Sequence, residues 1–144
     1  MAIIRDKEHA LKIFSEYAAL LDKEGIEYSN DQHGFYVHIP LRNIEKSFTL
    51  VCPVINGKVL LTDYCGDCYT GLKTSRTVEK AIRLKFPDYD IKLEHYAGGY
   101  EPVIYRELEY TTPAALHEQV LAISEVADEG FRIGKEMLGE HFLR

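Results

Sequence analysis

The pair Asn56-Gly57 lies between two apolar runs and constrains the fold more than any other feature of this sequence. Residues 47–55 are rich in apolar and β-branched side chains, and residues 58–63 continue that character. An Asn-Gly pair between two such runs is the preferred sequence for a two-residue turn that joins antiparallel strands. We therefore expect a β-hairpin here, with Pro53 at a sheet edge or at a bulge.

Similar patterns predict the neighbouring elements. Residues 5–24 have the apolar periodicity of an amphipathic helix, with Leu11 on its apolar stripe, and Gly25 is expected to end it. Residues 29–34 form a cluster of turn-forming residues. In residues 35–39 the apolar side chains alternate with Tyr and His, which predicts a strand with one buried face.

The second half of the chain repeats this alternation of helix and hairpin. Thr74 or Ser75 is expected to cap a helix that ends at Phe86. Residues 90–109 then predict a hairpin with its turn at Gly98-Gly99.

The last predicted element is a long helix that Thr112 caps and Pro113 begins. Gly130 and Gly134 each weaken it by about 1 kcal/mol relative to Ala, so it can bend or split there. The complete order is α-β-β-β-α-β-β-α. We therefore predict an α+β fold in which helices pack on one face of an antiparallel sheet of about five strands, in two hairpin groups, with residues 1–144 forming a single domain.

The composition argues against several classes of protein. The chain has 23 acidic and 17 basic side chains, a formal net charge of −6, and its basic residues are scattered, so we expect no nucleic-acid partner. No apolar run approaches the ~20 residues of a membrane span, and the charged N-terminus does not resemble a signal peptide. Three cysteines without an export signal suit the reducing cytoplasm.

Two cysteines lie in the segment Tyr64-Cys65-Gly66-Asp67-Cys68-Tyr69. Cys65 and Cys68 have the spacing of one half of a zinc site, and Cys52 could supply a third ligand from across the hairpin. His38 or His95 could complete a tetrahedral set. Alternatively, Cys52 is a small core residue on the same strand face as Phe48, Leu50 and Val54.

The same C-x-x-C spacing is found in redox enzymes, where a helix N-terminus lowers the pKa of one thiol. Here the next helix is expected only near residue 75, and Asp67 between the thiols opposes thiolate formation. A different pattern, Pro87-Asp88 followed by Asp90-x-Lys92, is similar to the acid-x-Lys strand of metal-dependent nucleases, with Asp63 as another candidate acid. No complete catalytic constellation is present, so the sequence favours a non-enzymatic role that requires no cofactor.

The chain has ten tyrosines and no tryptophan, and most of the tyrosines fall in expected strands and turns. Tyrosine combines a rigid apolar ring with a polar tip and is enriched in binding hot spots. The sequence predicts a protein-binding surface that contains Tyr36, Tyr64, Tyr69, Tyr96 and Tyr100. The alternative is that tyrosines paired across strands only stabilise a solvated sheet face.

Two segments resemble an uncharacterised prokaryotic and phage domain family. Val59-Leu60-Leu61-Thr62-Asp63 resembles its strand-Leu-Thr-Asp-turn element, and residues 120–128 resemble its closing helix. This sequence departs from the pattern at Tyr64-Cys65, where an acid and a glycine usually follow. The resemblance implies a bacterial or mobile-element origin. The order of elements also resembles type III secretion-chaperone-like proteins, which are small, acidic and often dimeric.

Together these observations predict a protein that acts by binding another protein. It would be a phage or mobile-element modulator, such as an inhibitor, of a host bacterial system, or a secretion-chaperone-like adaptor. A homodimer is possible because the end of the last helix, residues 131–142, could dock a second copy. The third alternative is a zinc- or thiol-dependent protein centred on Cys65 and Cys68.

Overall fold

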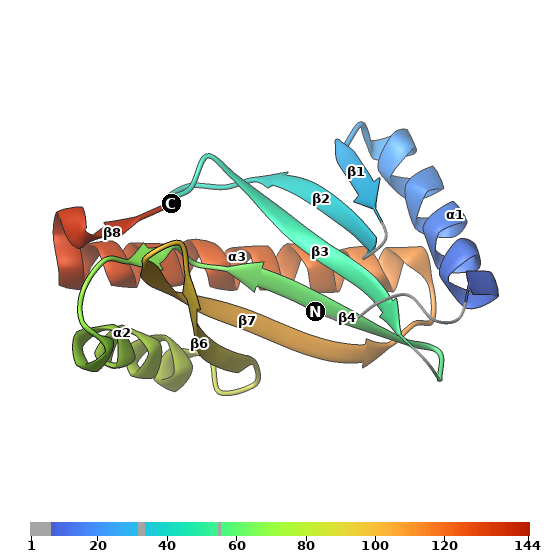
Figure 1. Ribbon diagram of the computed structural model, residues 1–144. Helices are drawn as coiled ribbons and strands as arrows, with labels where there is room; N and C mark the ends of the chain where they lie inside the picture. Colours follow the sequence, from blue (N-terminus) through green and yellow to red (C-terminus); the bar gives the residue numbers. More distant parts are fainter. Residues whose placement is uncertain (1–6, 32–33, 55) are drawn as a thin grey trace.

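The computed structural model describes residues 7–31, 34–54 and 56–144, in which three α-helices lie on one face of a curled, eight-stranded antiparallel sheet (Figure 1). The helices are α1 (Lys7–Glu24), α2 (Leu72–Lys85) and α3 (Pro113–Leu138), and the short 3-10 helix η1 (Gly139–His141) follows α3. The strands are β1 (Tyr28–Asp31), β2 (Gly34–Pro40), β3 (Lys46–Val54), β4 (Lys58–Tyr64), β5 (Asp67–Cys68), β6 (Asp90–Tyr96), β7 (Gly99–Glu109) and β8 (Phe142–Leu143). The predicted α+β class is confirmed, with more strands than the five expected.

The sheet runs β1-β2-β3-β4-β7, and β6 pairs with the free side of β7. The short strands β5 and β8 extend it near the start of β7. Figure 1 shows α3 lying along the sheet, with α1 near β1 and β2 and α2 beside β6. In the described part of the chain, no helix combines the length and the apolar character that crossing a bilayer requires.

The expected first helix is confirmed as α1, and residues 5 and 6 of the prediction lie outside the described residues. Ile13, Tyr17 and Leu21 are fully buried along its apolar stripe. Gly25 has φ +69° and ends the helix in the left-handed conformation that glycine adopts at no steric cost. The prediction for Leu11 was wrong, since 67% of this residue is exposed.

The first hairpin, β3–β4, is confirmed. Asn56 and Gly57 both have positive φ, the conformation for which this pair is preferred. The register pairs Val54 with Lys58, so residues 55–57 connect the strands, one residue more than predicted. Residue 55 itself lies outside the described residues.

The second hairpin, β6–β7, is also confirmed, but its turn is displaced by one residue. Tyr96 pairs with Gly99, and the turn is therefore Ala97-Gly98, both with positive φ. The Gly98-Gly99 pair predicts the turn one residue later, because glycine is the residue that tolerates positive φ best. The closure of a tightly paired hairpin places a non-glycine residue, Ala97, in this conformation instead.

Two boundaries differ from the prediction because neighbouring segments provide other hydrogen bonds than those expected. Helix α2 begins at Leu72, and neither Thr74 nor Ser75 caps it, since the N-cap is Gly71. The Ser75 side chain is buried and its hydroxyl lies 3.1 Å from that of Thr70. Strand β1 extends into the predicted turn cluster because its residues pair with β2.

Helix α3 begins as predicted, with the Thr112 side chain accepting a hydrogen bond from the Ala115 amide and Pro113 in the first turn. It continues unbroken through Gly130 and Gly134, contrary to the expected bend or split. A Cβ at Gly130 would lie 2.3 Å from Cys65 Sγ, and one at Gly134 would lie 2.5 Å from the Phe142 ring. The two glycines therefore let the sheet approach the helix backbone closely.

A buried polar cluster lies between α3 and the centre of the sheet. The Asp63 carboxylate accepts hydrogen bonds from Thr49 Oγ1 (2.7 Å), Ser47 Oγ (3.2 Å) and the Tyr64 amide (2.8 Å). Ser124 of α3 lies 2.8 Å from the Thr49 hydroxyl and donates to the Val120 carbonyl of its own helix. Burial raises the pKa of Asp63 to about 6, although its hydrogen-bond donors oppose the shift.

Replacing Gly130 by Ala should destabilise the protein, although the same change in an open helix stabilises it by about 1 kcal/mol. The added methyl would overlap Cys65 Sγ, and overpacking of this kind costs about 1–3 kcal/mol. Urea denaturation of Gly130→Ala, Cys65→Ala and the double variant measures the effect. The double variant should lose less stability than the sum of the single changes, and strict additivity would contradict the proposed contact.

Asp63 should make the protein less stable as the pH rises. Its pKa in the folded state, about 6, is above the ordinary value of 3.8, so the folded state holds the proton more tightly and stability falls between about pH 4 and pH 6. The full loss would be about 3 kcal/mol. Thermal unfolding from pH 4 to 8 should show this slope in the wild type and a smaller slope in Asp63→Asn. Equal slopes would show that Asp63 does not titrate as expected.

Candidate functional site

The face of the sheet away from α3 is apolar along β3, the reverse of what an open sheet face normally presents. Ser47 and Thr49 point towards α3, while Phe48, Leu50 and Cys52 alternate with them and point to the opposite side. The prediction that Cys52 belongs with Phe48 and Leu50 on one strand face is confirmed, but that face is not the one beneath the helices.

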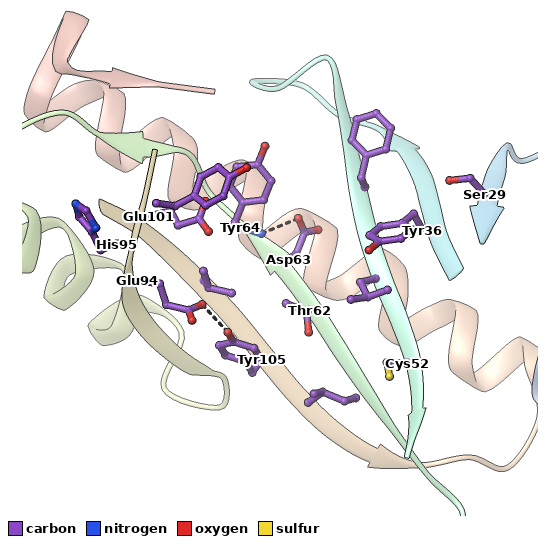
Figure 2. A pocket seen from close by; sticks show the side chains of 15 residues that line it. Ser29, Tyr36, Cys52, Thr62, Asp63, Tyr64, Glu94, His95, Glu101 and Tyr105 are labelled. Atoms are coloured by element: carbon purple, nitrogen blue, oxygen red, sulfur yellow. Dashed lines mark hydrogen bonds between the residues drawn. The ribbon is translucent and has the colours of Figure 1, made fainter. Parts of the chain in front are cut away.

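These residues contribute to a groove of about 730 Å³ on the open face (Figure 2). The floor is apolar and consists of Leu50, Cys52, Leu60 and Val103. Aromatic rings lie around the floor, namely those of Tyr36, Phe48, Tyr64, Tyr96 and Tyr105. The polar lining residues are Ser29, Thr62, Glu94, His95 and Glu101, and Asp63 adjoins the groove although its carboxylate accepts hydrogen bonds from Ser47 and Thr49 on the helix side. Residues of β1, β2, β3, β4, β6 and β7 thus build one surface, although several of these strands are far apart in the sequence.

The groove is more acidic where β6 and β7 meet. Glu94 and Glu101 lie directly opposite each other in the β6–β7 register. Tyr105 Oη donates to Glu94 at 2.5 Å, as Figure 2 shows. Burial raises the pKa of Glu101 to about 7, and the nearby carboxylates of Asp67 and Glu94 add to the shift. This end of the groove therefore holds one carboxyl group, that of Glu101, whose ionised form a nearby cation would stabilise.

The structure brings together three of the five tyrosines predicted for binding, since Tyr36, Tyr64 and Tyr96 line the groove. Tyr69 is exposed beside Gly99 and outside the lining set. Tyr100 packs against the hydrophobic core on the helix side. The predicted binding set lacked Tyr105, although it occupies the same face of β7 as Val103 and its alternation with Ile104 was visible in the sequence.

Cys52 is separated from the other two cysteines by the sheet, since Cys65 and Cys68 both belong to the core on the helix side. Cys52 lines the groove, whereas Cys65 packs against Gly130 of α3 and Cys68 belongs to the core. Burial raises the pKa of both Cys65 and Cys68, that of Cys68 to about 11, so both thiols hold their protons at neutral pH. Within the described residues, no three His, Cys, Asp or Glu side chains form a group that could hold a metal ion. The zinc and thiol interpretation stays a prediction that elemental analysis can test.

The residues of the nuclease-like pattern are also separated. The Asp63 carboxylate points towards Ser124 and Thr49 beneath the sheet. Asp90 and Lys92 form an exposed ion pair, with 3.6 Å between Nζ and Oδ2, at the start of β6. The two acids therefore do not converge on one site.

Comparison with known proteins gives structural neighbours only. No protein family and no curated protein match the sequence. YbjN from E. coli, a proposed transcription regulator, has a crystal structure that matches with a TM-score of 0.61 and 13% identity, over 93% of this chain and 95% of that chain. An uncharacterized protein from Methanothermobacter thermautotrophicus matches with a TM-score of 0.55 and 10% identity, over 88% of this chain and 99% of that chain. At these identities the likeness shows that bacterial and archaeal proteins share this fold.

Proposed function

We propose that this protein is a non-enzymatic binding module that holds an apolar segment of another protein in the groove on the open face of its sheet. The observation that carries this proposal is the apolar groove itself. A solvated antiparallel sheet face normally carries polar side chains, whereas this one carries Leu50, Leu60, Val103 and five aromatic rings. Apolar patches that are rimmed by polar residues are typical of interaction sites.

The edge strands of the sheet are poorly suited to pairing with a strand of a partner protein. We therefore expect the partner to bind on the open face of the sheet. An unpaired edge strand offers amides and carbonyls to an incoming strand. On β6, the Leu93 amide donates to Glu79 Oε2 at 3.0 Å, and the Ile91 carbonyl accepts from Arg83 Nη2 at 2.6 Å. Glu79 and Arg83 of α2 thus occupy the middle of this edge. The edge strand β1 has only four residues, Tyr28–Asp31.

The proposal includes two biological roles that the same groove would serve. One is a modulator of a host bacterial system, encoded by a phage or another mobile element. The other is an adaptor that resembles secretion chaperones and shields an apolar segment of its client. The identity of the bound partner distinguishes them, and a second copy of this chain would indicate a homodimer.

Replacing Phe48 by Asp should abolish partner binding and leave the fold intact, because Phe48 lines the groove and 46% of it is exposed. The matched control is Leu84→Asp, which introduces the same charge at a position on α2 that is 83% exposed and outside the groove. Proteins that the wild type captures and Phe48→Asp does not capture are the candidate binding partners. Each is then purified and titrated by calorimetry.

We expect Phe48→Asp to raise the Kd at least about tenfold, which corresponds to 1.4 kcal/mol, and Leu84→Asp to leave it unchanged. Circular dichroism should show the same fold for all three proteins. Equal binding by both variants would place the interaction elsewhere. A small apolar molecule found in the groove by native mass spectrometry, with no protein that depends on Phe48, would replace the proposal by ligand binding.

A further inference from the structure

The charges at one end of the groove indicate which kind of partner segment can bind there. Glu94 on β6 and Glu101 on β7 face each other across the two strands, and like charges at such positions are unfavourable. Asp67 of β5 shares a hydrogen bond with Glu101. Two carboxyl groups of the groove lining, Glu94 and Glu101, and that of Asp67 next to the groove therefore influence one another at this end.

The basic groups near this end compensate the carboxyl groups only in part. Arg144 lies over the Tyr64 ring, with 4.4 Å between the guanidinium carbon and the ring centroid, and its charge lowers the pKa of Asp67. Lys92 lies 5.7 Å from the centre of the Tyr105 ring and pairs with Asp90. Arg144 thus offsets part of the charge of Asp67, and Lys92 offsets that of Asp90.

The other polar groups at this end are engaged with the carboxylates or lie beside them. Tyr105 donates to Glu94, Tyr69 donates to Asp67, and His95 also lines the groove. When all three carboxyl groups are ionised, this end of the groove is acidic.

Asp67 and Glu101 can share a hydrogen bond only while one of the two carboxyl groups is protonated. When both are ionised, the buried atom Asp67 Oδ1 has no hydrogen-bond donor among the described residues. Buried acceptors are nearly always paired, and a donor from a bound ligand would satisfy this one.

The chain itself demonstrates how this site holds a cation. Arg144 stacks on Tyr64 and donates to the Tyr64 carbonyl at 3.1 Å. A cation gains energy over an aromatic face as well as beside a carboxylate. Tyr96 and Tyr105 offer further rings along the same end of the groove.

We infer that the groove selects partner segments in which a lysine or arginine is adjacent to apolar side chains. The cation lies at Glu94, Glu101 and Asp67, and the apolar side chains lie on Leu60 and its neighbours in the floor. This inference rests on the proposed function and specifies the class of segment that is bound.

Selection of random displayed peptides on the purified protein tests the inference. Peptides retained by the wild type should be enriched several-fold in Lys and Arg beside apolar residues, relative to the unselected library. Selection on the Glu94→Gln, Glu101→Gln double variant should keep the apolar residues and lose the basic ones. The matched control is Glu107→Gln, which removes one carboxylate from the same face of β7, opposite Leu60 and near Lys58.

The pH dependence of a selected basic peptide gives a second readout. A bound cation stabilises the ionised form of Glu101, whose pKa is about 7, so affinity should rise as the pH increases through that value. The Glu101→Gln variant should bind the same peptide more weakly and with a smaller pH dependence.

Different results would contradict the inference and the proposed function. Peptides that depend on Phe48 but show no basic enrichment, or carry acids instead, would overturn the inference and leave the proposed function standing. If no peptide is retained above background, or if Phe48→Asp retains the same peptides, the proposed function fails and the inference fails with it.

Discussion

The hydrogen bonds between Asp63 and the hydroxyl groups of Ser47 and Thr49 determine which face of β3 lies beneath α3. Side chains alternate along a strand, and a shift of one residue would exchange the two faces completely. Because Ser47 and Thr49 are directed to the buried carboxyl group and to Ser124, the apolar Phe48 and Leu50 must face the other way. A polar cluster inside the protein thus produces an apolar surface outside it.

This arrangement lowers stability and leaves an apolar groove on the open face of the sheet. A buried carboxyl group costs free energy even when it accepts several hydrogen bonds, and apolar side chains on the open face contribute less to the core than they would beneath a helix. Gly130 and Gly134 bring α3 close to Cys65 and Phe142, so the helix side remains tightly packed despite its polar centre. The protein can therefore present an apolar groove without losing a defined core.

Contacts from other elements determine where the sheet ends, and no local sequence pattern identifies the residues that make them. Glu79 and Arg83 occupy part of the β6 edge, and β8 returns the end of the chain to β5. The same return places Arg144 against Tyr64 at the acidic end of the groove. The contacts of β8 and Arg144 join segments far apart in the sequence, whereas those of Glu79 and Arg83 join two successive elements. Neither kind was predictable from periodicity, because periodicity reports only the geometry within one element.

Local chemistry in the sequence was sufficient to predict both hairpins, the three helices and the Thr112 cap, since turns and caps depend on the conformations of a few adjacent residues. It also predicted a surface rich in tyrosine, and three of the five tyrosines named there line the groove. The sequence did not reveal which face of β3 is open, because both faces carry residues that suit a strand. Only the tertiary structure decided this, because Asp63 accepts hydrogen bonds from hydroxyl groups of the neighbouring strand β3, and one of them also contacts Ser124 of α3. The same choice of face places Tyr36, Tyr64, Tyr96 and Tyr105 in one groove, while Tyr100 packs against the core.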